Sequence, residues 1–254
     1  MTFSKYYLQK RGEEASDYAD AFSYEPKNGP ASSNRPLVIA ISDGASESAF
    51  SKPWAKMLVR SFVKRPFRSV DDVRSEVQLL SQSWHRAIHY RPLQWFAEEA
   101  AALGAFATLL GVEIFTDSSE SIKSGDWSAI AIGDSCLFQV RDDQLIESFP
   151  LLHSADFGNS PTLLSSNVSR NELVWDKVLV RSSAWKTGDV FFLTTDALAH
   201  WFLFQHERNE RPWEIFLGFN QDGNPIQSFS AWVKTQRSLS QLKDDDVTLL
   251  SIKL

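Results

Sequence analysis

The chain has 254 residues, 43% of them hydrophobic and 23% charged, which are the values of an ordinary soluble globular protein with a sizeable core. Its formal net charge of -6 argues against a nucleic-acid partner, since such proteins usually carry a basic stripe. Cys136 is the only cysteine, which excludes an intrachain disulfide, and no apolar leader or long uncharged run occurs. We therefore expect a cytoplasmic protein without a membrane partner, and we expect a monomer.

The first half of the chain predicts two strands followed by two long helices. Residues 21–24 and the β-branched run 37–41 are expected to be strands, joined by a hairpin loop over residues 26–36. Apolar residues then recur at helical spacing over residues 54–63 and again over residues 70–88. Both helices are therefore expected to bury one face against a sheet.

The middle of the chain predicts a meander of antiparallel strands. Residues 105–115 are apolar and extended. Residues 127–132 and 136–140 flank Gly133-Asp134-Ser135, which is expected to be the turn of a hairpin, and residues 145–149 form the next strand. Residues 150–187 are polar and irregular in sequence, and a connection of that length is usually functional or mobile.

The last third predicts a buried strand, several helices and a final strand. The strands are residues 190–195 and 247–254, and the helical patterns cover residues 197–206, 213–217 and 226–242. No internal repeat or convincing linker separates these elements, so we expect one domain over residues 1–254. Strands in runs and helices in pairs favour an α+β layered fold over an alternating parallel one.

Acidic residues recur where the predicted strands begin or end. Asp43 and Asp196 each end an apolar strand, Asp20 and Asp245 each precede one, and Asp134 lies in a turn. Converging carboxylates repel one another unless a cation lies between them, and an all-oxygen ligand set suits Mg²⁺ or Mn²⁺ rather than zinc. The alternative for each aspartate alone is a cap or turn residue, because Asp commonly forms turns.

Five short motifs, in their order and spacing, resemble those of type-2C protein serine/threonine phosphatases from about residue 10 to the C-terminus. They are Tyr18-Ala19-Asp20-Ala21-Phe22, Ser42-Asp43-Gly44, Gly133-Asp134-Ser135, Thr195-Asp196-Ala197-Leu198 and Asp245-Asp246-Val247-Thr248. The resemblance implies a four-layer α-β-β-α sandwich of two antiparallel sheets flanked by helix pairs. It also implies a metal site at one edge of the sandwich.

The resemblance further implies a role for each aspartate. Asp43 would bridge two Mn²⁺ or Mg²⁺ ions, and the carbonyl group of Gly44 would help bind the second. Asp196 and Asp245 would complete the shell of the first ion, and Asp20 would hold the second, directly or through water. These four aspartates are the expected catalytic residues. They would act by holding a metal-bridging hydroxide that attacks a phosphoserine or phosphothreonine of a protein substrate.

Other positions match the family less closely. Asp134 matches a residue that helps bind a third, weaker ion in some members, and Arg11 is the best candidate for the phosphate-binding arginine. Ala19 and His200 stand where many members have a further polar or acidic ligand. These two departures, together with the lack of a clear counterpart of the phosphate-binding arginine, leave a second hypothesis open, a weak or inactive relative that binds a phosphoprotein or partner. Residues 150–187 correspond in place to the family's flap beside the active site.

Overall fold

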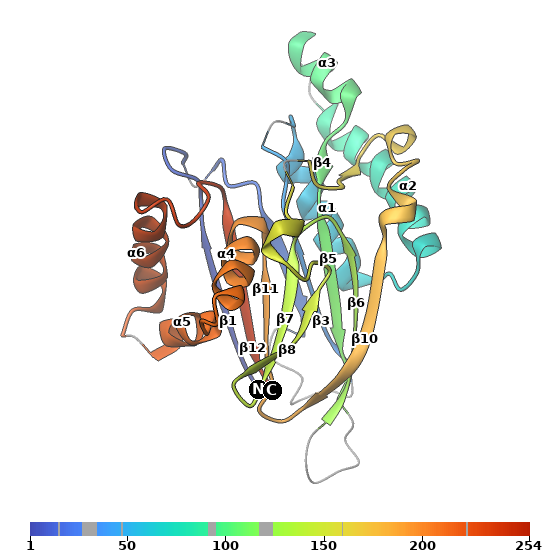
Figure 1. The fold of residues 1–254 in the computed structure, drawn as a ribbon. Coiled ribbons are helices and arrows are strands. Elements are labelled where there is room, and N and C mark those ends of the chain that lie inside the picture. Colours follow the sequence, from blue (N-terminus) through green and yellow to red (C-terminus); the bar gives the residue numbers. More distant parts are fainter. Residues whose placement is uncertain are drawn as a thin grey trace. The chain divides into compact units, whose positions relative to one another are not determined.

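The computed structural model describes residues 1–14, 16–26, 35–46, 48–90, 95–116, 124–158, 160–221 and 223–254. The protein is α+β, with two antiparallel five-stranded sheets and helices, as the sequence predicts (Figure 1). The chain divides into two compact units. Unit 1 comprises residues 1–18, 134–161 and 186–254, and unit 2 comprises residues 19–133 and 162–185. The single domain and the four-layer arrangement remain predictions.

The sheet of unit 1 has the strand order β1-β12-β11-β7-β8. Its strands are β1 (Thr2–Leu8), β7 (Cys136–Arg141), β8 (Gln144–Phe149), β11 (Val190–Thr194) and β12 (Val247–Lys253). Asp142 and Asp143 both have positive φ angles, 47° and 63°, which suit the tight turn that joins β7 to β8. Every residue of β11 is buried, so this apolar strand lies in the middle of the sheet.

Three helices complete unit 1, and α4 contacts β12 while α6 contacts β1 (Figure 1). They are α4 (Asp196–Glu207), α5 (Pro212–Gly218) and α6 (Pro225–Ser238), with short 3₁₀ turns at Ser154–Asp156 and Phe219–Gln221. Aromatic side chains fill the core between sheet and helices. The rings of Phe138 on β7 and Phe202 on α4, for example, stack with their centroids 4.0 Å apart. This packing fixes the start of α4, where Asp196 lies.

The sheet of unit 2 has the strand order β10-β6-β5-β3-β2. Its strands are β2 (Ala21–Glu25), β3 (Leu37–Ser42), β5 (Leu109–Ile114), β6 (Ser124–Ile132) and β10 (Leu179–Lys186). A separate two-stranded sheet pairs β4 (Phe106–Ala107) with β9 (Leu164–Ser165), and short 3₁₀ turns lie at Val168–Arg170 and Trp175–Lys177. The wholly buried strands β3 and β5 lie inside the main sheet, which matches their apolar sequences.

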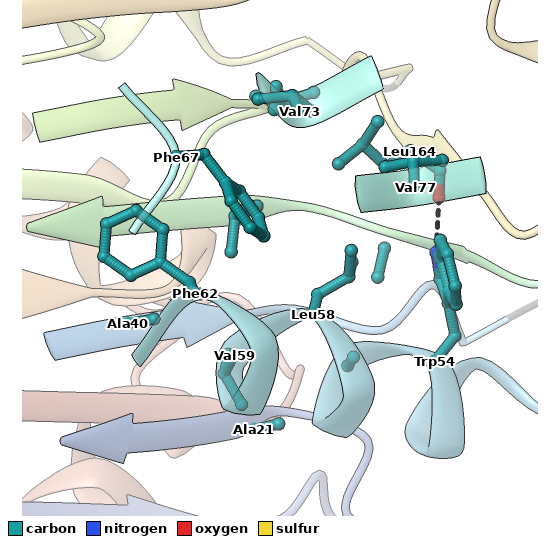
Figure 2. Close-up of a cluster of buried hydrophobic side chains, with 14 of the residues drawn as sticks. Ala21, Ala40, Trp54, Leu58, Val59, Phe62, Phe67, Val73, Val77 and Leu164 are labelled. Atoms are coloured by element: carbon teal, nitrogen blue, oxygen red, sulfur yellow. Dashed lines mark hydrogen bonds between the residues drawn. The ribbon is translucent and has the colours of Figure 1, made fainter. Parts of the chain in front are cut away.

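The helices of unit 2 are α1 (Ser51–Lys64), α2 (Val70–Ile88) and α3 (Trp95–Leu103). Helix α1 packs on β2 and β3 and also contacts α2. Its apolar side chains Trp54, Leu58 and Phe62 are almost completely buried (Figure 2). The indole nitrogen of Trp54 donates to the carbonyl oxygen of Leu164, 2.9 Å away, the bond dashed in Figure 2. This bond ties α1 to β9.

Most of the predicted elements are confirmed, including the two long helices and the antiparallel pairing of β2 with β3. The loop predicted over residues 26–36 lies mostly outside the described residues. The hairpin predicted around residues 133–135 is wrong, because β6 and β7 belong to different sheets and do not pair. The irregular segment 150–187 also contains the eight-residue strand β10. Among the described residues, no helix is both long and apolar enough to cross a membrane.

Candidate metal centre

Three of the predicted metal ligands lie at the same end of the sheet of unit 1. Asp134 stands two residues before β7, and Asp245 stands two residues before β12. Asp196 is the first residue of α4 and is separated from the end of β11 by Thr195 alone. The register pairs Thr194 on β11 with Cys136 on β7 and with Leu249 on β12. Antiparallel pairing therefore brings these strand ends, with their carboxylates, to one sheet edge.

Asp196 and Asp245 share a single cation, the ammonium group of Lys243. The distance from its Nζ to Oδ2 of Asp196 is 2.7 Å, and to Oδ2 of Asp245 it is 2.8 Å. Burial lowers the pKa of Lys243, but the two carboxylates outweigh it and raise the pKa above its ordinary value. The two carboxylates of the predicted first metal ion thus converge on one point, and a positive charge already lies there.

Asp134 is the most perturbed carboxyl group of this edge. The residue is 7% exposed, and its Oδ1 atom is buried without a hydrogen-bond partner. Burial raises its pKa to about 7, and the nearby negative charge of Asp196 adds to the rise. A buried oxygen that lacks a partner suits a cation ligand, because a cation would offset the cost of its burial.

The loop after β1 is fastened to the same edge by Arg237 of α6. This buried guanidinium donates from Nη1 to the carbonyl oxygen of Gln9 at 2.9 Å, and from Nη2 to that of Asp245. Arg11, the predicted phosphate-binding residue, lies in this loop with its side chain 58% exposed, and its Nε is 3.8 Å from Asp244. The structure therefore places Arg11 near the chain segment that carries Asp245.

The remaining predicted ligands lie in unit 2, at one end of its sheet. Asp20 directly precedes β2 and Asp43 directly follows β3, and the pairing of Ala21 with Ser42 puts both aspartates at the same end. Asp20 is 2% exposed, whereas Asp43 is half-buried. The hydroxyl of Thr108 accepts a bond from the Asp43 amide at 2.9 Å, which anchors the chain where β3 ends.

Gly44 stands in a position that is too crowded for a side chain. Its backbone forms an isolated bridge with Ala107. A Cβ atom placed on it would lie 2.9 Å from the carbonyl oxygen of Ala19 and 3.2 Å from Ser51. The glycine therefore lets the backbone run close to Asp20 and the start of α1, which suits a position whose carbonyl group is the predicted ligand.

The donor chemistry fits a hard divalent ion. The predicted ligands are carboxylate and carbonyl oxygens, and Mg²⁺ and Mn²⁺ prefer such ligands. In the part of the chain that the structure describes, no three His, Cys, Asp or Glu side chains form a ready-made metal cluster. In unit 1 the observation that supports the fit is the pair of carboxylates around the Lys243 ammonium, with the partnerless oxygen of Asp134 at the same edge.

Comparison with known proteins identifies the family. A family model described as "Protein phosphatase 2C" matches residues 20–241, which is most of the chain. The chain belongs to the protein phosphatase 2C family. The matched residues include Asp20, Asp43, Asp134 and Asp196, whereas Asp245 lies beyond them. Comparison with curated proteins gives no match.

Solved structures of low identity share the protein phosphatase 2C fold over the whole chain. The photosystem II phosphatase PBCP is 16% identical with a TM-score of 0.54, and covers 100% of this chain and 98% of its own. The PPM Ser-Thr phosphatase MsPP from Mycobacterium smegmatis is 15% identical with a TM-score of 0.52 and the same coverage. PppA of Pseudomonas aeruginosa is 14% identical with a TM-score of 0.50, and the match covers 99% of this chain and 96% of PppA. At these identities the likeness shows the fold alone.

The structure also gives positions to residues that sequence reasoning treated differently or missed. His200 lies on α4, where its ring packs against those of Phe157 and Phe204. Lys243 and Arg237 were not predicted to lie at the sheet edge that carries Asp196 and Asp245. The one sequence feature that could have placed Lys243 at this edge is its position two residues before Asp245. A charged residue at such a position is equally consistent with a solvent-exposed loop residue.

Proposed function

We propose that the protein hydrolyses phosphoserine and phosphothreonine in protein substrates and depends on two Mn²⁺ or Mg²⁺ ions. The observation that supports this most directly is the convergence of Asp196 and Asp245 on one cation position in a chain of the protein phosphatase 2C family. In this proposal the same two carboxylates hold the first ion. Asp43, the Gly44 carbonyl and Asp20 would hold the second, and Asp134 a third and weaker one.

The protein residues would position the ions and the substrate rather than attack it. When bound, the ions supply an activated water and neutralise charge on the phosphoryl oxygens. Carboxylates at strand ends are held by the sheets, so they lose little freedom when they bind a cation. Arg11 carries an exposed guanidinium on the loop tied to the Asp245 segment, and it would bind the phosphate of the substrate.

The segment 150–187 would shape the choice of substrate in this proposal. Its part in unit 1 includes the 3₁₀ turn at Ser154–Asp156, where Ser154 donates to the carboxylate of Glu207 on α4. The rival hypothesis, a relative that binds phosphoprotein without turnover, is not proposed, because family membership and the four retained aspartates both favour hydrolysis.

The test is hydrolysis of p-nitrophenyl phosphate and of a phosphothreonine peptide by the whole chain, with Mn²⁺, with Mg²⁺ and with chelator. We expect turnover with at least one ion, none with chelator, and little turnover of a matched phosphotyrosine peptide. A folded protein that turns over neither substrate with either ion would contradict the proposal. Equal rates with and without chelator would contradict the metal dependence.

A further inference from the structure

A lysine side chain lies where the first metal ion of unit 1 would bind. The Nζ atom of Lys243 is within hydrogen-bond distance of Oδ2 of both Asp196 and Asp245, at 2.7 and 2.8 Å. Among the described residues it is the only cationic side chain bonded to either carboxylate group. The side chain of Lys243 is 60% exposed, whereas those of Asp196 and Asp245 are 14% and 21% exposed.

Local backbone contacts hold Lys243 and Asp245 in this arrangement. The amide of Asp245 donates to the carbonyl oxygen of Lys243 at 3.1 Å, which bends the chain tightly between them. The buried guanidinium of Arg237 binds the Asp245 carbonyl, and Oδ1 of Asp246 accepts from the amide of Lys10 at 2.8 Å. The segment that presents both the lysine and the aspartate is therefore tied to α6 and to the loop after β1.

The two carboxylate oxygens of Asp196 have different hydrogen-bond donors. Its Oδ1 accepts a hydrogen bond from the amide of Ala197 at 2.6 Å in the first turn of α4. Its Oδ2 accepts a hydrogen bond from the ammonium group of Lys243. A Mg²⁺ ion bound by oxygens lies about 2.0–2.1 Å from each of them. An ion that used the two Oδ2 atoms would therefore overlap with the ammonium group, so the two cations exclude each other.

We propose that Lys243 is an internal competitor for the first metal ion. In the metal-free protein its ammonium neutralises Asp196 and Asp245, and a divalent ion binds only when the lysine side chain swings out into water. This inference rests on the proposed function in one respect, that these two aspartates are metal ligands. Because the side chain of Lys243 is largely exposed, the exchange can occur without unfolding the segment that carries Asp245. The protein would then respond to a higher concentration of free ion than the aspartates alone would require.

The test is calorimetric titration of Mn²⁺ into the metal-free whole chain, into Lys243→Met and into the matched control Lys234→Met. Lys234 lies on α6 of the same unit, and its replacement removes the same charge. We expect Lys243→Met to bind the tighter ion with a Kd lower by about tenfold, since no ammonium must be displaced. The control is expected to stay within about twofold of the parent. An unchanged or higher Kd in Lys243→Met would overturn the proposal, as would an equal gain in the control.

A second measurement uses the unaltered protein and covers the case in which Lys243→Met does not fold. Reductive methylation of lysines, read by mass spectrometry, reports how free each ammonium group is. We expect labelling of Lys243 to rise several-fold when Mn²⁺ is added, while labelling of Lys234 stays constant. No rise at saturating Mn²⁺ would overturn the proposal.

The outcomes separate this inference from the proposed function. Mn²⁺ binding that tightens in Lys243→Met, in a protein that hydrolyses no phosphoester, would sustain the competition and refute the phosphatase activity. Turnover with Mn²⁺ together with an unchanged Kd in Lys243→Met would support the phosphatase activity and refute the competition. Absence of binding of both Mn²⁺ and Mg²⁺ in every variant would refute both.

Discussion

The ion pair of Arg141 and Asp189 gives a stability prediction that can be worked from the structure of unit 1. Asp189 is completely buried just before β11, and Arg141 at the end of β7 donates to both of its carboxylate oxygens at 2.7 Å. Gln139 donates at 2.7 Å and the amide of Lys186 at 3.0 Å. Replacing Arg141 with Met would leave a buried carboxylate with its main partner removed.

The expected loss is about 3 kcal/mol in the free energy of unfolding at pH 7. Breaking a buried pair by removing one partner costs about 3–5 kcal/mol. The lower end applies, since the Arg141 side chain is 26% exposed and the donors Gln139 and Lys186 remain. A second change, Asp189→Asn in the same variant, removes the stranded charge and is expected to recover part of the loss.

The same pair predicts how the loss depends on pH. Burial raises the pKa of Asp189, but the bonds from Arg141, the Lys186 amide and Gln139 outweigh it and hold the pKa below its ordinary value. A lowered carboxyl pKa contributes stability that is present above the ordinary pKa and is lost as the pH falls through the folded-state pKa. The gap between the parent and Arg141→Met should therefore be full at pH 7 and shrink below about pH 4.

Urea unfolding followed by tryptophan fluorescence at pH 7, 5, 4 and 3 measures this gap for the parent, Arg141→Met and the double variant. A loss below 1 kcal/mol at pH 7 would refute the reasoning about the buried charge. A gap of constant size down to pH 3 would refute the linkage to Asp189.

Three further changes test the packing and the carboxylates. Gly111→Ala would put a Cβ 2.4 Å from the buried ring of Phe62, so thermal unfolding should show a loss of about 2 kcal/mol, and an unchanged midpoint would contradict this. Trp54→Phe removes the indole N–H that donates to the carbonyl oxygen of Leu164. Urea unfolding should again show a loss of about 2 kcal/mol in the free energy of unfolding, and no loss would contradict this. Asp134→Asn should stabilise the metal-free protein above pH 7, because a carboxyl with a raised pKa costs stability once it ionises, and the gain should vanish below about pH 4. A gain that is the same at every pH would contradict the last prediction.

Helices α1 and α2 were predictable because their signal is local. Apolar residues repeat at helical spacing over both, and Ser69 caps α2 by accepting the amide of Asp72 at 3.1 Å. Strand β1 carried no such signal, since Tyr6 is its only fully buried residue. Strand β10 was hidden for the same reason, with most of its residues exposed. Edge strands owe their place to distant partners, and spacing along the sequence does not reveal these.

The wrong hairpin shows the limit of turn chemistry. Gly133 has a φ of 100°, as a tight turn favours, and Asp134 and Ser135 follow it as in many hairpins. The same three residues instead carry the chain from β6 in one sheet to β7 in the other. A local turn signal states that the chain changes direction, but pairing depends on which strands are adjacent.

The positions of the aspartates at the strand ends could be predicted from the sequence, whereas those of Lys243 and Arg237 could not. An aspartate that flanks an apolar run is expected at the end of a strand, and the sequence shows this directly. The pairing of β11 with β12 then brings Asp196 and Asp245 to one edge of the sheet. Lys243 reaches that edge only through the tight bend between it and Asp245. Arg237 comes from a helix, and its buried position depends on contacts with Gln9 and Asp245. Such contacts follow from tertiary packing, so residue spacing gives no warning of them.

The most direct test of the proposed phosphatase compares Asp43→Asn and Asp196→Asn with the matched control Asp142→Asn. Asp142 is an exposed turn residue at the far end of β7, and its positive φ suits asparagine. The measurement is the Mn²⁺-dependent hydrolysis of the phosphothreonine peptide, with folding checked by circular dichroism. The account predicts a loss of at least about a hundredfold in kcat/KM for each site variant, and parent-like turnover for the control. Full activity in a folded Asp43→Asn or Asp196→Asn protein would contradict it.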